Sequence, residues 1–150
     1  IYRYKYRGIS FLSGIMGFWM AETLTRCSTW DIDIIIPVPL HRRRERKRGF
    51  NKAVLLAKDI GKNIGKEVAQ HILIRSKDTP TQVGLDKFQR MWNLWDAFQV
   101  RQPDALKGKT VLLVDDVFTT GSTAHHCSRV LLGAGAKQIY VLTLATVRHV

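Results

Sequence analysis

Residues 111–123, VLLVDDVFTTGST, constrain the fold more than any other stretch of this sequence. Four apolar residues lead into two adjacent carboxylates, and a short run of Thr, Gly and Ser follows. A continuous apolar run of this kind is typical of a strand that is buried on both faces of a parallel sheet. The polar residues would then stand at the carboxyl end of the strand, which is where open α/β sheets bind ligands.

Predicted strands and helices alternate along the whole chain. Strands are β-branched apolar runs, and helices show apolar residues on one face. The predicted strands are 32–38, 68–75, 97–100, 110–114 and 138–146, and the predicted helices are 9–24, 50–66 and 122–132. This alternation indicates the α/β class, with a mainly parallel sheet flanked by helices. With 150 residues, we expect one domain that spans positions 1–150.

The first predicted helix, ISFLSGIMGFWMAETL, is apolar but only sixteen residues long. A membrane-spanning helix needs about 20 apolar residues. Leu12, Ile15, Met16 and Trp19 recur at helical spacing, which predicts that they form the face that packs on the core. Peripheral contact with a membrane surface is the alternative.

Asp115 and Asp116 have the chemistry for sugar and metal binding. Carboxylates accept hydrogen bonds from ribose hydroxyls and bind Mg²⁺, and the alternation of a strand can aim one of the two at a ligand. The residues that follow lead into a helix, where unpaired N–H groups and hydroxyls suit a phosphate. These candidate phosphate ligands are Thr119, Thr120, Gly121, Ser122 and Thr123. Ordinary turn and capping roles are the alternative for both groups.

A second polar segment, PVPLHRRRERKRGFN at 37–51, follows the predicted strand at 32–38. Six of the eight residues from His41 to Arg48 are Lys or Arg, within a chain of net charge +12. We expect a basic loop at the same sheet edge. Guanidinium groups suit pyrophosphate oxygens, and contact with nucleic acid or solvent is the alternative. A further polar excursion is predicted at 76–93, and long polar loops of this kind are often functional.

The stretch 111–123 resembles the signature of type I phosphoribosyltransferases, which bind phosphoribosyl pyrophosphate (PRPP). Together with PVPLHRRRERKRGFN, the segment TPTQVGLDKFQRMWNLWDAF at 79–98 and the opening YKYRG, it resembles the ComF family of competence-associated phosphoribosyltransferase-like proteins. The resemblance implies a type I phosphoribosyltransferase-like α/β fold with a hood at about 76–98. It also implies binding of PRPP with Mg²⁺, in which Asp115 and Asp116 serve the ribose hydroxyls and the metal and residues 119–123 take the 5′-phosphate.

Further site residues are carried over from the family pattern. The basic segment matches it at Arg44, Arg48, Gly49, Phe50 and Asn51, and the hood matches it at Gln82, Gly84, Leu85, Arg90, Asn93, Ala97 and Phe98. Arg42 stands where the family often has Pro, and Lys52 where it often has Gln. ComF proteins commonly begin with a cysteine-rich zinc ribbon, and the sequence from Ile1 onward carries no such group of cysteines. The only cysteines, Cys27 and Cys127, predict neither a metal site nor a disulfide.

The expected function is that of a phosphoribosyltransferase-like protein that acts in natural competence and DNA uptake, with transfer of phosphoribose to an acceptor that the sequence does not name. The alternative is a non-catalytic module of the transformation machinery that binds single-stranded DNA. The expected location is the cytoplasm, with contact to the inner face of the membrane as a further expectation.

Overall fold

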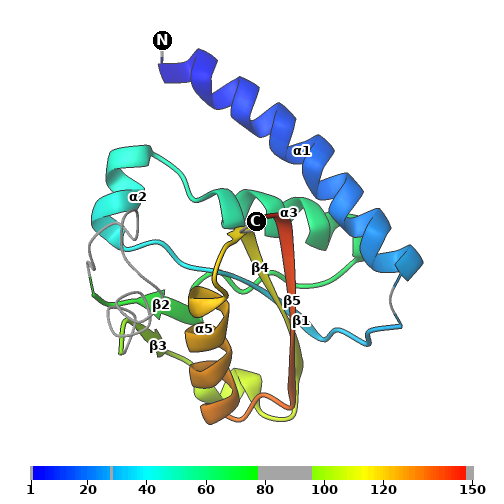
Figure 1. Cartoon of the computed structure of the whole chain (residues 1–150), viewed down its shortest axis with the longest axis vertical. Helices are drawn as coiled ribbons and strands as arrows, with labels where there is room; N and C mark the ends of the chain where they lie inside the picture. Colours follow the sequence, from blue (N-terminus) through cyan, green and yellow to red (C-terminus); the bar gives the residue numbers. More distant parts are fainter. Residues whose placement is uncertain (1, 28, 78–95, 148–150) are drawn as a thin grey trace.

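The computed structural model describes residues 2–27, 29–77 and 96–147 (Figure 1). The helices are α1 (Tyr2–Cys27), α2 (Arg42–Arg48), α3 (Lys52–Ile64), the 3₁₀ turn η1 (Pro103–Leu106) and α5 (Ser122–Gly133). The strands are β1 (Ile34–Pro37), β2 (Leu73–Arg75), β3 (Phe98–Val100), β4 (Thr110–Phe118) and β5 (Gln138–Thr146).

A parallel sheet with the order β1–β4–β5 forms the centre of the molecule. Ile34 of β1 lies opposite Val111 of β4, and Thr110 of β4 lies opposite Gln138 of β5. The residues from Val111 to Val114 are fully buried, as expected for a parallel strand that is covered on both faces. This arrangement confirms the predicted α/β fold with a mainly parallel sheet.

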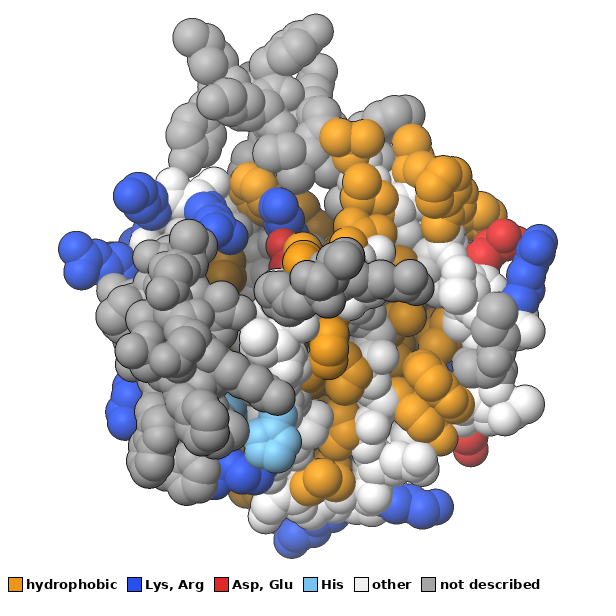
Figure 2. All heavy atoms as spheres, in the orientation of Figure 1, with side chains coloured by type: hydrophobic (Ala, Val, Ile, Leu, Met, Phe, Trp, Pro, Cys, Tyr) orange, Lys and Arg blue, Asp and Glu red, His pale blue; other side chains and the backbone are white. Residues whose placement is uncertain are grey.

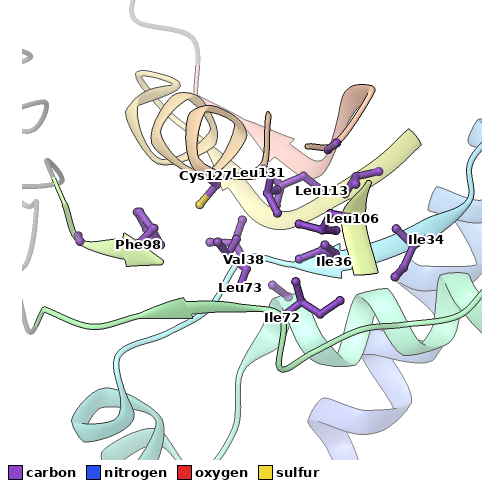
Figure 3. Close-up of a cluster of buried hydrophobic side chains, with 14 residues drawn as sticks. Ile34, Ile36, Val38, Ile72, Leu73, Phe98, Leu106, Leu113, Cys127 and Leu131 are labelled. Atoms are coloured by element: carbon purple, nitrogen blue, oxygen red, sulfur yellow. The ribbon is translucent and has the colours of Figure 1, made fainter. Parts of the chain in front are cut away.

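One face of the sheet packs against α5 (Figure 3). Ile36 and Leu113 point from the sheet toward Cys127 and Leu131 of the helix, and all four side chains are fully buried. Burial raises the pKa of the Cys127 thiol well above its usual value, so the group packs as a neutral, apolar side chain.

The other face of the sheet packs against α3 and α1 (Figure 1). Leu112 and Val114 lie in this second cluster with Leu56, Ile60 and Met20. Successive residues of β4 therefore alternate between the two layers, as strand geometry requires. The strand continues to Phe118 because β5 pairs with it as far as Thr146, so the two aspartates lie on the strand and not after it.

The predicted helix at 9–24 is present as the longer α1, but of the four residues predicted to face the core only Met16 packs against it. Leu12 and Trp19 are exposed at 52% and 65%, and Ile15 at 39%. The residues that face the core are Ser13, Gly17, Met20, Ala21 and Leu24. A methyl group at Gly17 would overlap Asp59, so small residues let α1 approach α3 closely, and the Ser13 Oγ donates to Asp59 Oδ2 at 3.2 Å. No helix in the described ranges is long and apolar enough to cross a bilayer.

The basic segment is not the loop that the sequence predicted, because residues 42–48 form α2. His41 caps the N-terminus, where its side chain accepts from the Arg43 N–H at 3.4 Å. Gly49 ends the helix with a φ of 82°, a left-handed conformation that glycine adopts without strain. These two caps allow a helix to form although most of its residues repel one another.

The strand predicted at 68–75 is also corrected. Val68 makes only a single bridge to Ile35, and the strand proper is the short β2. It pairs antiparallel with β3 in a separate two-stranded ribbon, with Arg75 opposite Phe98. The predicted hood residues Gln82 and Arg90 lie outside the described residues.

Candidate functional site

A cleft of about 220 Å³ opens where β1 and β4 end. Its walls come from the turn after β1, from α2 and the start of α3, from the end of β2, and from the end of β4 with the loop after it. The lining residues are Val38, Pro39, Leu40, Arg44, Arg48, Asn51, Lys52, Arg75, Asp115, Asp116, Val117, Thr119 and Thr123. The two polar segments that the sequence placed at one sheet edge therefore share one cleft.

Both aspartates line the cleft, but they leave β4 toward different layers. Asp115 continues the α5 side of the strand and Asp116 the α1/α3 side, where Lys52 Nζ lies 3.8 Å from its Oδ2. The Asp116 N–H donates to Asp115 Oδ1 at 2.8 Å, which fixes the first carboxylate against the backbone. The pair presents two carboxylates to one ligand from slightly different directions.

The carboxyl group of Asp115 has a raised pKa. Burial raises the pKa of its carboxyl to about 7, and the negative charge of Asp116 acts in the same direction. The hydrogen bond from the Asp116 N–H and the positive charge of Arg75 lower this pKa. Near neutral pH the site can therefore exist with or without a proton on Asp115.

The loop after β4 supplies hydroxyls and main-chain N–H groups. Gly121 is the N-cap of α5 with a φ of 78°, and it contributes no side-chain cap hydrogen bond. The first N–H groups of a helix have no partner within the helix, so these face the loop. Thr119 and Thr123 line the cleft and, with Gly121, a small recess beside it. Thr120 Oγ1 and Ser122 Oγ lie 2.9 Å apart and line neither hollow.

The arginines of α2 fall into two groups that border different hollows. Arg44 and Arg48 line the cleft, whereas Arg42 and Arg46 border a separate shallow hollow on the far side of α2. Figure 2 shows basic side chains gathered at the upper left, over the position of α2 in Figure 1.

Asn51 belongs to the cleft and also to the framework. Its side chain is 7% exposed, its Nδ2 donates to the Val38 carbonyl at 3.0 Å, and its Oδ1 accepts from the Ala53 N–H at 3.0 Å. Asn51 therefore caps α3 and ties the basic segment to the end of β1.

Sequence reasoning missed two cationic residues of the cleft. Arg75 lies at the end of β2 with its guanidinium 5.5 Å from the centre of the Phe98 ring, and Lys52 reaches the cleft from the first turn of α3. Arg75 had a weak signal, since it is the last residue of a predicted strand next to a polar excursion. Lys52 was noticed only as a departure from the family pattern.

The donor set fits Mg²⁺ that arrives with a phosphate ligand. Mg²⁺ is usually held by one or two carboxylates together with substrate phosphates, and Asp115 and Asp116 provide such a pair at the cleft wall. Within residues 2–27, 29–77 and 96–147, no group of three or more His, Cys, Asp or Glu side chains could hold a metal by itself. The carboxylates therefore suit a shared metal better than a resident one.

A family model described as "Phosphoribosyl transferase domain" matches residues 46–149, and the chain belongs to this family. The match contains Arg48 and the cleft-lining parts of α3, β2, β4 and the loop after β4, whereas Arg44 and the turn after β1 lie before it.

The chain also has relatives of known name. It is 35% identical over 141 residues to Competence protein F of Haemophilus influenzae. The aligned region covers 85% of this chain and 62% of that protein. It is 37% identical over 112 residues to DNA utilization protein YhgH of Escherichia coli O157:H7. This aligned region covers 75% of this chain and 48% of that protein. These relatives confirm the resemblance to the ComF family, and the chain spans about half to three fifths of their length.

A solved structure supports the fold. Glutamine phosphoribosylpyrophosphate amidotransferase from B. subtilis has a TM-score of 0.58 and 18% identity, over 88% of this chain and 26% of that one. The likeness shows the type I phosphoribosyltransferase fold.

Proposed function

We propose, from membership of the phosphoribosyl transferase domain family, that this chain binds PRPP with Mg²⁺ in the cleft. Asp115 and Asp116 accept hydrogen bonds from the ribose hydroxyls and share the metal. The loop from Thr119 to Thr123 holds the 5′-phosphate with its N–H groups and hydroxyls. Arg44 and Arg48 hold the pyrophosphate, because guanidinium groups bind its oxygens with charge-assisted hydrogen bonds.

One observation carries this proposal. The two arginines and the two aspartates come from segments more than sixty positions apart, yet they line a single cleft together with Thr119 and Thr123. A capping or turn role explains each motif alone, but it does not explain why they meet. A ligand with negative groups at both ends and hydroxyls between them explains the meeting.

The reaction that we propose is transfer of phosphoribose to a nitrogen nucleophile. The nitrogen lone pair forms a bond to the anomeric carbon, and the carbon–oxygen bond to pyrophosphate breaks with its electrons on the departing oxygen. Bound Mg²⁺ would supply positive charge that stabilises this leaving group. The chain's own contribution is to orient the sugar from its remote 5′-phosphate and to place two arginines beside the pyrophosphate. Water exclusion by hood residues such as Gln82 and Arg90 stays a prediction.

The biological setting that we propose is the handling of DNA during natural competence, in the cytoplasm. It is supported by relatives named Competence protein F and DNA utilization protein.

Calorimetric titration of PRPP with Mg²⁺ tests the site. The variant Asp115→Ala/Asp116→Ala should lose at least about 100-fold in affinity, since it removes the acceptors for the ribose hydroxyls and the metal. The matched control is Asp31→Ala/Asp104→Ala, which makes the same change of charge at two exposed aspartates outside the cleft. The control should bind as the wild type does. Equal heats for the wild type and both variants would show that the cleft is not the PRPP site.

A non-catalytic module that binds single-stranded DNA is the second candidate. The observation that favours it is the exposed basic surface of α2 beyond the cleft, including Arg42 and Arg46 (Figure 2). DNA binding of this kind should weaken steeply with salt and should survive in Asp115→Ala/Asp116→Ala. Release of pyrophosphate in the presence of an acceptor would instead favour the enzyme.

A further inference from the structure

A second hollow of about 290 Å³ lies between α1, α3 and the end of β5. Its walls are almost entirely apolar. Leu12 and Met16 come from α1, Leu55 and Leu56 from α3, and Leu144 from β5, and the polar lining residues are Ser13, Lys52 and Asp116. The Ser13 hydroxyl already donates to Asp59, so the groove offers a ligand few polar atoms apart from the Lys52–Asp116 pair.

This groove is an exposed apolar surface in a strongly basic chain. Leu12 and Leu144 both line this hollow, and their exposed fractions are 52% and 38%. Figure 2 shows apolar side chains over the region of α1 and β5. Contiguous exposed apolar surface next to a polar cleft is typical of a ligand-binding groove.

The groove is continuous with the proposed PRPP site. Lys52 and Asp116 line both hollows, and the 3.8 Å contact between Lys52 Nζ and Asp116 Oδ2 stands at their common boundary. Asp115, in contrast, lines the cleft and the recess on the α5 side, but not the groove. A molecule in the groove therefore lies directly beside Asp116, one of the two carboxylates that we assign to the ribose.

We propose that the groove receives the ring of the acceptor, and that the acceptor is an aromatic nitrogen nucleophile with few polar substituents. This inference rests on the proposed transfer function. Apolar walls stabilise a flat apolar ring by removing its surface from water. A ring with many donors and acceptors would lose hydrogen bonds to water there without regaining them. The volume lies near the lower end of the roughly 300–1,000 Å³ range of small-molecule sites, which suits one or two fused rings.

The transfer also releases one proton. As the nitrogen forms its bond to the anomeric carbon and the bond to pyrophosphate breaks, the N–H proton passes to water at the open side of the groove, where Leu12 and Leu144 are exposed.

Benzimidazole is a suitable probe, because it has two fused rings, one N–H group and no exocyclic polar group. Adenine is the polar comparison of similar size. Binding of each to the full chain is measured by ligand-observed NMR, and transfer by pyrophosphate release with PRPP and Mg²⁺. Benzimidazole should bind at least about tenfold more tightly than adenine and should support faster release.

Two matched variants of α1 locate the ring. Leu12→Glu places a carboxylate in the groove, whereas Ile15→Glu makes the same change at an exposed position of α1 that does not line it. Leu12→Glu should weaken benzimidazole binding at least about tenfold, and Ile15→Glu should stay within about twofold of the wild type. Both positions are solvent-exposed, so both variants should fold, and PRPP should bind both equally.

The outcomes separate the two proposals. If PRPP binds but benzimidazole binds the two variants equally, or does not bind the wild type, the groove assignment is overturned. If Leu12→Glu alone abolishes benzimidazole binding but PRPP gives no heat with the wild type, the groove is a ligand site and the proposed transfer function fails. Tighter binding of adenine than of benzimidazole overturns the inferred acceptor class.

Discussion

The two walls of the cleft are built in different ways. The acidic wall consists of Asp115 and Asp116 on β4, which pairs with a strand on each side. Val114, the residue before the two aspartates, is fully buried. The basic wall is α2, in which no residue is buried. The ends of this helix are capped by His41 and Gly49, and the buried Asn51 follows it.

This difference separates stability from binding. A change in the acidic wall disturbs a strand at the centre of the sheet, so it should alter the free energy of unfolding as well as affinity. A change on α2 should alter affinity much more than stability, because none of its residues is fully buried. The following predictions test whether the two walls behave in this way.

The largest expected effect is on the basic wall. Arg44→Ala/Arg48→Ala should weaken PRPP binding by about 100-fold or more, because each charge-assisted hydrogen bond contributes about 1.5–3 kcal/mol. Arg42→Ala/Arg46→Ala removes the same charge from the same helix but from outside the cleft, and it should cost less than about fivefold. Calorimetry gives the affinities and urea unfolding should show both variants within about 0.5 kcal/mol of the wild type. Equal losses of affinity would mean that only the overall charge matters.

An intermediate effect is expected at the turn that begins α5. Gly121→Val should lower the free energy of unfolding by about 2–3 kcal/mol, because the φ of 78° disfavours Val and its Cβ would lie 2.8 Å from the Phe118 ring. Gly108→Val has a similar φ of 69° but meets nothing within 4 Å, so it should cost about 1–2 kcal/mol.

Chemical denaturation measures both glycine variants, and PRPP titration separates them further. Gly121→Val should also weaken PRPP binding, whereas Gly108→Val should not. If Gly121→Val left both measurements unchanged, the loop that joins the acidic wall to α5 would contribute neither to stability nor to PRPP binding.

The smallest effect concerns pH. With the pKa of Asp115 raised to about 7, its ionised fraction grows about tenfold between pH 6 and pH 8, and PRPP affinity should rise accordingly. The folded protein also keeps a proton that the unfolded chain loses near pH 4, so the free energy of unfolding should fall as pH rises from about 4 to 7 and then level off.

Asp115→Asn should abolish the contribution of Asp115 to both pH dependences. Calorimetry at each pH measures the PRPP affinity, and urea titration at each pH measures the free energy of unfolding. The exposed Asp104→Asn should leave both pH dependences unchanged. Identical pH profiles for the wild type and Asp115→Asn would show that Asp115 does not titrate in this range.

Local sequence was sufficient to find the acidic wall. The apolar run from Val111 to Val114 predicted a buried parallel strand, and the residues after it predicted a loop and a helix, all of which the structure confirms. The extension of β4 to Phe118 could not be predicted, because it depends on pairing with β5, a contact made by a distant part of the chain.

Local sequence failed where small residues or end effects decide the outcome. The helix α1 buries Ser13, Gly17 and Ala21 against α3, and such residues carry little hydrophobic signal, so the larger apolar residues were assigned to the core instead. The helix α2 was predicted as a loop, whereas His41 and Gly49 cap it as a helix. Arg75 entered the cleft through the β2–β3 ribbon, a tertiary arrangement that no local pattern records.

The different layers that Asp115 and Asp116 face have a practical consequence for protein engineering. Asp115 shares its layer with α5, and Asp116 shares its layer with α1 and α3. A mutant library confined to one helical layer would therefore retune one carboxylate and leave the surroundings of the other intact. The surroundings of the two carboxylates, although the residues are neighbours in sequence, can therefore be altered one after the other.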